Sequence, residues 1–513
     1  MRHDFSQIPA ANIPRSTFNL SAPYKTTMDA GYLVPFFCQE ILPGDTHIVT
    51  AHVFGRLATP IHPIMDNAHL ETFFFFVPNR LVWDNWDKFL GAQTDPGDSV
   101  DFTIPVTNAT STSPVTTGTV GDYLGHPLSV DYDTDEVNVL PGRGIRLIWN
   151  EWFRDENLQD SLDINTDDGP DIQFFGYAGV PPRRGKRHDY FTSCLPWPQK
   201  GPGVDLPLGT SAPVAAVGAT NDLVIVQDEL ASTAKQTLAS SGGNVQIGGA
   251  SALDINLFAD LGDATAATIN DLRQAFQIQK LLERDARGGT RAQEVVLAHF
   301  GVRGGDARLN RPEYLGGGTH PVGITQVPQT SQSASTPQGN LSAYGTTGGR
   351  SGFTKSFTEH GYVIGFVNLR ADLTYQKGLH RKWTRSTKYD FYWPALAKIG
   401  EQAVLNKEIY HQGTSDDDLV FGYQERNAEY RFNEGMVTGL FRSDATGSLD
   451  PWHLSQDFSA LPVLNSSFIE DDPPFDRIIA VPDEPHLLLD AYFHHKAVRP
   501  MPVNGAPGYI DHF

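Results

Sequence analysis

The stretch from residue 73 to residue 91, FFFFVPNRLVWDNWDKFLG, joins two different hydrophobic patterns. Residues 73–77 are all large and apolar, and a strand sends successive side chains to opposite faces. A strand of this kind therefore has both faces covered. After Pro78 the apolar residues of 83–90 recur at helical spacing, and Gly91 is a plausible helix end. We predict a fully buried strand that leads directly into an amphipathic helix packed against it. By itself this pattern describes a well-filled core and no particular function.

Other runs rich in β-branched and aromatic residues predict further strands. These runs occupy 32–41, 46–54, 145–149, 172–177, 222–227, 361–369, 476–481 and 487–493. With 48 glycines and 35 prolines in 513 residues, such strands are typical of an antiparallel sandwich or jelly roll. Their wide separation along the chain places the remaining residues in long loops.

Two adjacent helices are also predicted. The pattern of 269–287 begins at a capping box on Thr268 and ends at Gly288. A second helix is predicted over 290–301, with Gln293 at the capping-box position. We interpret this pair as a structural brace and not as a site of chemistry.

Composition and charge restrict the possible functions. Charged residues make up 19% of the chain, which is below the usual quarter. Two cysteines, Cys38 and Cys194, do not form a disulfide scaffold or a zinc site, and they fit a reducing compartment. No apolar stretch approaches a membrane span, so no membrane insertion is expected. The net charge of -21 argues against a chain that coats nucleic acid unaided, because phosphate contacts come from Lys and Arg.

Catalytic and metal-binding motifs do not emerge from the sequence. The chain has no P-loop, no G-x-S-x-G elbow, no H-E-x-x-H helix and no paired-cysteine metal spacing. The acidic runs 416–418 and 470–472 fit solvated loops better than Ca²⁺ sites. We therefore expect no enzymatic activity, no metal and no cofactor.

Two segments differ in composition from the rest. Residues 203–268 contain one basic residue, seven acidic ones and a single aromatic, Phe258, which is a composition typical of a solvated loop. Residues 316–352 are rich in Gly, Ser, Thr and Gln. They are either a disordered linker or an extended arm that becomes ordered on a neighbouring subunit. Ile324, Val327 and Tyr344 favour the arm, because they give it side chains with which to dock.

One basic cluster contains Arg183, Arg184, Lys186 and Arg187 within five positions. It is a candidate contact for nucleic acid, because cations track the phosphate backbone. The alternative is a surface loop or a donor of salt bridges between subunits.

A second cluster interleaves cations with aromatic residues, which is the combination that holds single-stranded nucleic acid. Its candidate contacts are Arg381, Lys382, Trp383, Arg385 and Lys388. The alternative is that Trp383 belongs to the core while its charged neighbours are solvated. Neither cluster predicts base specificity.

A series of motifs runs in a fixed order through most of the chain. The segment 65–91, MDNAHLETFFFFVPNRLVWDNWDKFLG, is the most distinctive of them. The others lie at 13–18, 25–31, 42–46, 56–60, 189–193, 195–201, 283–291, 311–317, 389–394, 421–426 and 452–454. In this order they closely resemble the major capsid proteins of the gokushoviruses, small tailless single-stranded DNA phages of the microvirus family. Asn427 and Ala292 depart from the family pattern, where aromatic residues are expected.

The resemblance implies a mainly β fold, an antiparallel eight-stranded viral jelly roll with long inserted loops and a few helices. It also implies self-assembly of sixty copies into a T=1 icosahedral shell around a circular single-stranded DNA genome. A small basic DNA-packaging protein is the implied partner that neutralises the genome. The implied location is the virion, after assembly in the host bacterial cytoplasm.

The same resemblance gives a division of the chain. Residues 1–202 form an N-terminal arm and the first part of the capsid wall. Residues 203–268 form a surface insertion, the threefold protrusion, which is expected to meet a host-cell surface receptor. Residues 269–513 hold the helical pair, the arm 316–352 and the remainder of the jelly roll. The alternative function is a jelly-roll carbohydrate-binding or carbohydrate-active protein, and the enzyme would need paired carboxylates across an aromatic cleft.

Overall fold

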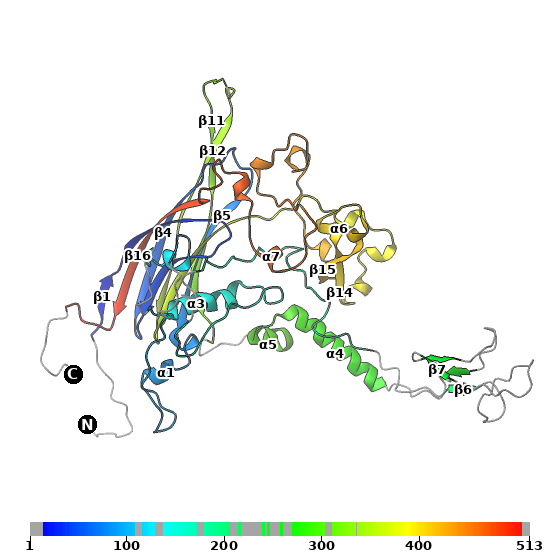
Figure 1. The fold of residues 1–513 in the computed structure, drawn as a ribbon, viewed down its shortest axis with the longest axis horizontal. Coiled ribbons are helices and arrows are strands. Elements are labelled where there is room, and N and C mark those ends of the chain that lie inside the picture. Colours follow the sequence, from blue (N-terminus) through cyan, green and yellow to red (C-terminus); the bar gives the residue numbers. More distant parts are fainter. Residues whose placement is uncertain are drawn as a thin grey trace, which may run out of the picture. The chain divides into compact units, whose positions relative to one another are not determined.

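Two antiparallel sheets form the centre of the chain in the computed structural model (Figure 1). The structure describes residues 14–107, 115–128, 137–171, 179–205, 214–216, 239–241, 244–246, 257–259, 269–302, 310–334 and 336–504. Within this part the chain divides into two compact units, one made of Met1–Pro198 with Arg303–Phe513 and the other of Gln199–Val302. The predicted mainly β class with antiparallel sheets is confirmed.

The first sheet has six strands in the order β1-β16-β4-β12-β11, and β2 also pairs with β16. Its strands are β1 (Ser16–Asn19), β2 (Ala22–Met28), β4 (Thr46–Leu57), β11 (Gly323–Pro328), β12 (Leu341–Ser356) and β16 (Leu487–Arg499). The second sheet has four strands in the order β10-β5-β13-β3. These are β3 (Val34–Ile41), β5 (Ala68–Pro78), β10 (Glu313–Pro321) and β13 (Gly361–Ala371). The strands predicted at 32–41, 46–54, 361–369 and 487–493 are thereby confirmed.

Strand β5 is buried on both faces, as its run of aromatic residues predicts. Phe74 and Phe76 point into the core that the two sheets share. Phe75 and Val77 point the other way, into a second core that also contains Trp83. The helical part is shorter than predicted, because a 3-10 turn η1 (Asn79–Leu81) and a single helical turn α1 (Trp86–Phe89) replace one continuous helix.

The second core is closed by α3 (Leu140–Ile148), which continues into a π-helical turn η2 (Trp149–Phe153) and packs on β13 and β5. The strand predicted at 145–149 was wrong. Ile145, Ile148 and Trp149 are spaced by three and one, so a helix brings all three to one buried face. Gly144 permits the close approach of this helix, because a Cβ there would lie 3.1 Å from Ile364 Cδ1.

The interpretation of 316–352 as an arm was also wrong, because this segment contains most of β10, all of β11 and most of β12, which belong to the two sheets. Its glycines serve close strand packing. A Cβ on Gly317 would lie 2.1 Å from the Thr72 carbonyl oxygen, and one on Gly352 would lie 2.0 Å from that of Val49. Glycine is the residue that allows such approaches between backbones. In Figure 1 the β11–β12 hairpin extends beyond the ends of the other strands.

The rest of the first unit is made of short elements. A two-stranded sheet of β14 (Glu401–Leu405) and β15 (Val420–Glu425) packs with α6 (Asn406–Ile409) and α7 (Ser466–Ile469) around a third core. The short helices η6 (Ser415–Asp418), η7 (Ala428–Tyr430), η8 (Gly439–Phe441), η9 (Asp450–Trp452) and α2 (Val120–Tyr123) complete it. The strand predicted at 476–481 was wrong. The 3-10 turn η10 (Phe475–Arg477) lies there, and the neighbouring residues Ile478 and Ile479 are both buried. In a half-buried strand, neighbouring side chains point to opposite faces, so only one of the two would be buried.

The second unit contains α4 (Ile269–Gly288) and α5 (Ala292–Phe300), so both predicted helices are confirmed. The cap of α5 lies one residue later than predicted, because the Arg291 backbone N–H donates to Glu294. Short strands β6 (Val214–Ala216) and β9 (Leu257–Ala259) pair, as do β7 (Ala239–Ser241) and β8 (Asn244–Gln246). The strands predicted at 172–177 and 222–227, most of 203–268 and the capping residue Thr268 lie outside the described residues.

Candidate nucleic-acid interface

The second basic cluster lies on the connection between β13 and β14. Three 3-10 turns order this connection, namely η3 (Arg381–Trp383), η4 (Lys388–Asp390) and η5 (Pro394–Leu396). The Asp390 carboxylate accepts hydrogen bonds from the backbone N–H groups of Thr387, at 2.6 Å, and Ser386, at 2.9 Å. These bonds lower the pKa of Asp390 to about 2, so it remains a charged anchor of the turn.

Arg381 and Arg385 hold the connection to the rest of the subunit. Arg381 donates to the carbonyl oxygen of Ala403 at 3.0 Å and lies 3.4 Å from the buried carboxylate of Glu408. Burial raises the pKa of Glu408, and the charge of Arg381 opposes that rise. Arg385 donates to the carboxylate of Glu429 at 3.1 Å, and this pair is almost completely buried. The two arginines therefore have structural roles within their own subunit.

Lys382, Trp383, Lys388 and Tyr389 face solvent instead. The Trp383 side chain is 71% exposed, so the alternative that placed it in the core was wrong. The Lys382 ammonium lies 5.3 Å from the centre of the Trp383 ring, and the Lys388 ammonium lies 5.0 Å from that of Tyr389. Each pair combines an exposed cation with an exposed ring, which are the two elements of a single-strand contact.

More exposed rings follow directly along the chain. Phe391, Tyr392 and Trp393 are each about half exposed. The orientation of the Trp393 ring is fixed locally, because its indole N–H donates to the Lys388 carbonyl oxygen at 2.7 Å. The sequence interpretation did not include these three residues among the candidate contacts. A run of four aromatics from Tyr389 to Trp393, interrupted only by Asp390, was the available signal.

The cations of the first basic cluster, 183–187, are paired with groups of their own subunit. Arg184 forms an ion pair with the buried carboxylate of Glu71, and its guanidinium lies 4.8 Å from the centre of the Phe73 ring. Arg187 bridges Glu71 and Asp372, at 2.9 Å each. These pairs tie the connection before residue 189 to β5, which leaves little of its charge for an external phosphate.

The other two cations of this cluster are engaged in the same way. Arg183 lies 2.7 Å from Asp472 and stacks on Tyr32, with 4.4 Å between the guanidinium and the ring centre. Lys186 is buried and donates to the Gln456 side-chain oxygen at 3.0 Å. Burial lowers the pKa of Lys186 to about 8.

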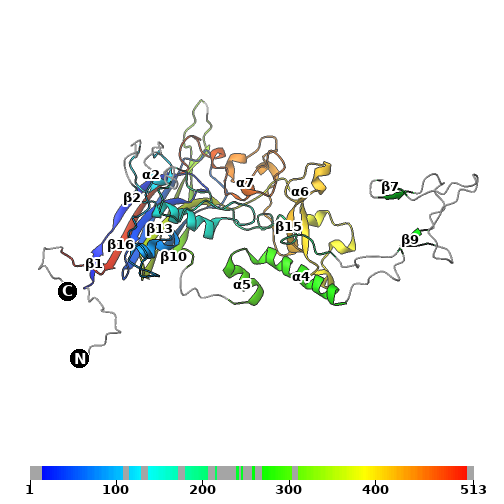
Figure 2. The same cartoon turned by 60° about the horizontal axis from the view of Figure 1, so that its bottom comes forward.

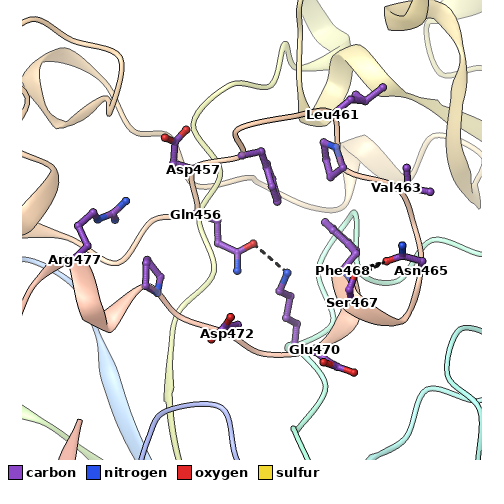
Figure 3. A pocket seen from close by; sticks show the side chains of 14 residues that line it. Gln456, Asp457, Leu461, Val463, Asn465, Ser467, Phe468, Glu470, Asp472 and Arg477 are labelled. Carbon is purple, nitrogen blue, oxygen red and sulfur yellow. Dashed lines mark hydrogen bonds between the residues drawn. The ribbon is translucent and has the colours of Figure 1, made fainter. Parts of the chain in front are cut away.

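Lys186 also lines a pocket of about 520 Å³ (Figure 3). Its wall is made by the segment 456–477, and the labelled side chains of Phe468, Ser467 and Asn465 lie together on one side of it. Two of the three carboxylates that line the pocket are already paired, since Asp457 lies 2.8 Å from Lys377 and Asp472 lies 2.7 Å from Arg183, which leaves only Glu470. The pocket therefore does not present the free, paired carboxylates that a glycoside hydrolase needs.

Metal-ligand clusters were not found in the described ranges of the chain. The acidic run 416–418 has a structural role, because the carboxylate of Asp417 accepts backbone N–H groups of Gln412, Gly413 and Thr414. Both cysteines are free thiols.

None of the helices in the described part of the chain has the length and hydrophobicity that a bilayer crossing requires.

Comparison with known proteins identifies the family to which this fold and surface belong. The sequence profile of the capsid protein (F protein) family matches residues 6–509. The chain belongs to this capsid protein family. Similar proteins include capsid protein VP1 of Bdellovibrio phage phiMH2K, which is 46% identical over 100% of this chain and 98% of its own length. Capsid protein VP1 of Chlamydia phage 1 is 42% identical over 99% and 98%, and that of Spiroplasma virus 4 is 37% identical over 99% and 97%.

The resemblance to gokushovirus major capsid proteins is therefore confirmed. Family membership makes this chain a structural, non-enzymatic protein of the phage virion that assembles into a shell of many copies.

Proposed function

We propose that this capsid protein assembles as sixty copies into a T=1 icosahedral shell around a circular single-stranded DNA genome. The match over the full length of the chain to capsid proteins is the observation that carries this proposal. In such a shell the contacts between subunits are heterologous and close on themselves.

We infer that the wall of the shell is an eight-stranded viral jelly roll. The eight strands in chain order are β2, β3, β4, β5, β10, β12, β13 and β16. One sheet then contains the first, eighth, third and sixth strands, and the other contains the fifth, fourth, seventh and second. Strands that are neighbours in sequence thus alternate between sheets, except the fourth and fifth, which pair with each other, and the first strand lies beside the last. This is the order expected when a long hairpin is rolled into a sandwich of two Greek keys.

We propose that the exposed part of 381–393 is a contact for the genome. Lys382 and Lys388 supply charge and Trp383 supplies a stacking platform, without base specificity. We propose the cluster 183–187 only as a weaker contact for the genome, because its cations are already paired within the subunit.

We propose two partners for the chain, one inside the shell and one on the surface of the host cell. With a net charge of -21 it does not neutralise DNA by itself, which supports a small basic DNA-packaging protein inside the shell. We propose that 203–268 is the surface insertion that meets a host-cell receptor, between wall segments 1–202 and 269–513. The compactness of Gln199–Val302 as a separate unit supports an insertion at this place. Assembly is proposed to occur in the bacterial cytoplasm.

The genome contact is tested by a variant that leaves the buried ion pairs intact. Lys382→Gln, Lys388→Gln and Trp383→Ala together change only exposed side chains. Particles co-expressed with the packaging partner should form in normal yield and hold less DNA or release it at lower salt. Each lost phosphate contact should make the salt slope of DNA binding shallower by about 0.7.

Arg385→Gln is the matched structural control. It leaves the buried carboxylate of Glu429 unpaired, so its expected effect is a less stable subunit. Normal DNA content and an unchanged salt slope in the triple variant would remove 381–393 from the genome contacts.

A further inference from the structure

The two sheets differ in how their outward faces are covered. The four-stranded sheet is covered by α3 and by the second core. The six-stranded sheet is not covered in this way, because every second residue of β16 from Leu488 to Lys496 is exposed. Strand β4 shows the same alternation at His52, Phe54 and Arg56. We call the outward side chains of β2, β4, β12 and β16 the outer sheet face.

The charge of the outer sheet face is opposite to that of the whole chain. Its strands place four basic side chains outward, those of Lys25, Arg56, Arg350 and Lys496, and one acidic side chain, that of Asp490. Lys25 and Asp490 pair with each other at 3.1 Å. Among the described residues, Arg56, Arg350 and Lys496 have no ion-pair partner. A chain with a net charge of -21 therefore has a basic surface on one sheet.

Exposed rings stand between these cations. Phe54 is 55% exposed and Tyr492 is 43% exposed. The strand register places Tyr492 beside His52, and His52 beside Arg350, so a ring, an imidazole and a guanidinium form one row across three strands. Strands β2 and β16, which carry Lys25 and Tyr492, lie side by side in Figure 2.

On the β12 side of Phe54 the surface carries few side chains. Phe54 lies opposite Gly348 on β12, and a Cβ on that glycine would lie 4.0 Å from the Phe54 ring. Gly352, four residues further along the same strand, also has no side chain. A planar base approaches such a surface without a steric barrier, and every base has a π-face to stack.

We propose that the outer sheet face binds single-stranded DNA, through phosphate contacts to Arg56, Arg350 and Lys496 and base stacking on Phe54 and Tyr492. This proposal rests on the proposed function and adds a second genome contact, on the wall itself. Interfaces between protein subunits are depleted in charge at their centre, whereas here the cations are interleaved with the rings. That pattern favours a polyanion with aromatic bases over a second copy of the chain.

The test compares two triple variants of the full-length protein. Arg56→Gln, Arg350→Gln and Lys496→Gln remove the charge of the outer sheet face. Arg273→Gln, Lys280→Gln and Arg284→Gln remove three exposed cations from α4 as the matched control. Binding of a labelled oligothymidine is measured by fluorescence anisotropy from about 50 to about 200 mM salt. Phosphate contacts weaken strongly over this range.

We expect the sheet variant to bind with a salt slope shallower by about 2, because three single-strand phosphate contacts contribute about 0.7 each. The α4 variant should keep the wild-type slope. Phe54→Ala should weaken binding by between about fivefold and a hundredfold at every salt concentration. Arg56→Lys with Arg350→Lys keeps the charge and should retain the slope, which separates loss of contact from loss of fold.

Two results would overturn the inference. In the first, the sheet variant keeps the wild-type slope, and its particles keep their DNA; the capsid function then stands and this surface does not bind the genome. In the second, the sheet variant binds the oligonucleotide normally and fails to assemble, which makes the face a contact between copies. Failure of the wild-type protein to form DNA-containing particles is a separate result that contradicts the proposed function itself.

Discussion

The buried ion pair between Arg143 and Asp171 gives the sharpest stability prediction. The two side chains are 2% and 7% exposed, and they meet in a bidentate geometry with distances of 2.9 and 2.5 Å. Removing one partner of a buried pair leaves the other as an uncompensated charge, which costs about 3–5 kcal/mol. Arg143 keeps hydrogen bonds to the carbonyl oxygens of Val82, at 2.9 Å, and Asp167, at 3.0 Å. We therefore expect Asp171→Ala to lower the free energy of unfolding by about 3 kcal/mol, at the lower end of that range.

The assay is urea unfolding of the purified subunit, followed by tryptophan fluorescence. Trp83 and Trp149 lie in the core that this ion pair borders, so their emission reports on it. Asp490→Asn is the matched control, because its partner Lys25 is 74% exposed and exposed pairs contribute about 0–1 kcal/mol. Replacing both Arg143 and Asp171 with apolar residues should cost less than removing Asp171 alone. The reasoning is refuted if Asp171→Ala is no more destabilising than Asp490→Asn.

Three further outcomes follow from single positions. Gly31→Ala should destabilise the subunit by about 1–3 kcal/mol more than Gly413→Ala. Both glycines have positive φ, but only at Gly31 would a Cβ meet a backbone carbonyl, at 2.0 Å, and equal effects in urea unfolding would contradict this. Burial lowers the pKa of His495 to about 4, so stability is complete above the ordinary value of 6.5 and is lost as the pH falls from 6.5 toward 4. His495→Gln should flatten that loss in unfolding measured at pH 7 and pH 5, and an unchanged pH dependence would count against the buried imidazole as its source. Trp383→Ala should leave the urea midpoint of unfolding unchanged, because the ring is exposed. A large decrease in that midpoint would show that the ring is part of the core.

The strongly patterned strands could be predicted from the sequence because burial alone decides them. Four consecutive phenylalanines admit no half-exposed strand, and β5 indeed places Phe74 and Phe75 in two different cores. The helix α3 could not be predicted in this way. Its Gly142 and Gly144 weaken local helix propensity, and the contact with Ile364 that requires Gly144 lies more than two hundred residues away.

The glycine-rich segment 316–352 was misread for a similar reason. Flexible linkers and closely packed strands have the same composition, and only the tertiary partners of Gly317 and Gly352 distinguish them. The register that makes them strands is a long-range property, because β10 pairs with β5 and β12 pairs with β4.

The candidate site could be predicted as a region but not residue by residue. The alternation of cations and aromatics at 381–388 identified an exposed surface. The sequence gives no sign that Arg381 and Arg385 are committed to Glu408 and Glu429, because these acids lie on later elements that approach only in the fold. The outer sheet face was missed because its cations come from four strands distant in sequence, and only the sheet register brings them together.

Mass measurement of assembled particles tests the proposed capsid architecture most directly. Charge-detection mass spectrometry of the protein, purified after co-expression with its packaging partner, should show one closed species. Sixty copies of a 56.4 kDa chain give a protein shell of about 3.4 MDa, with additional mass from DNA that nuclease digestion removes only after the shell is opened. A monodisperse monomer under all assembly conditions, or a closed particle whose protein mass corresponds to a different number of copies, would contradict the proposed T=1 shell.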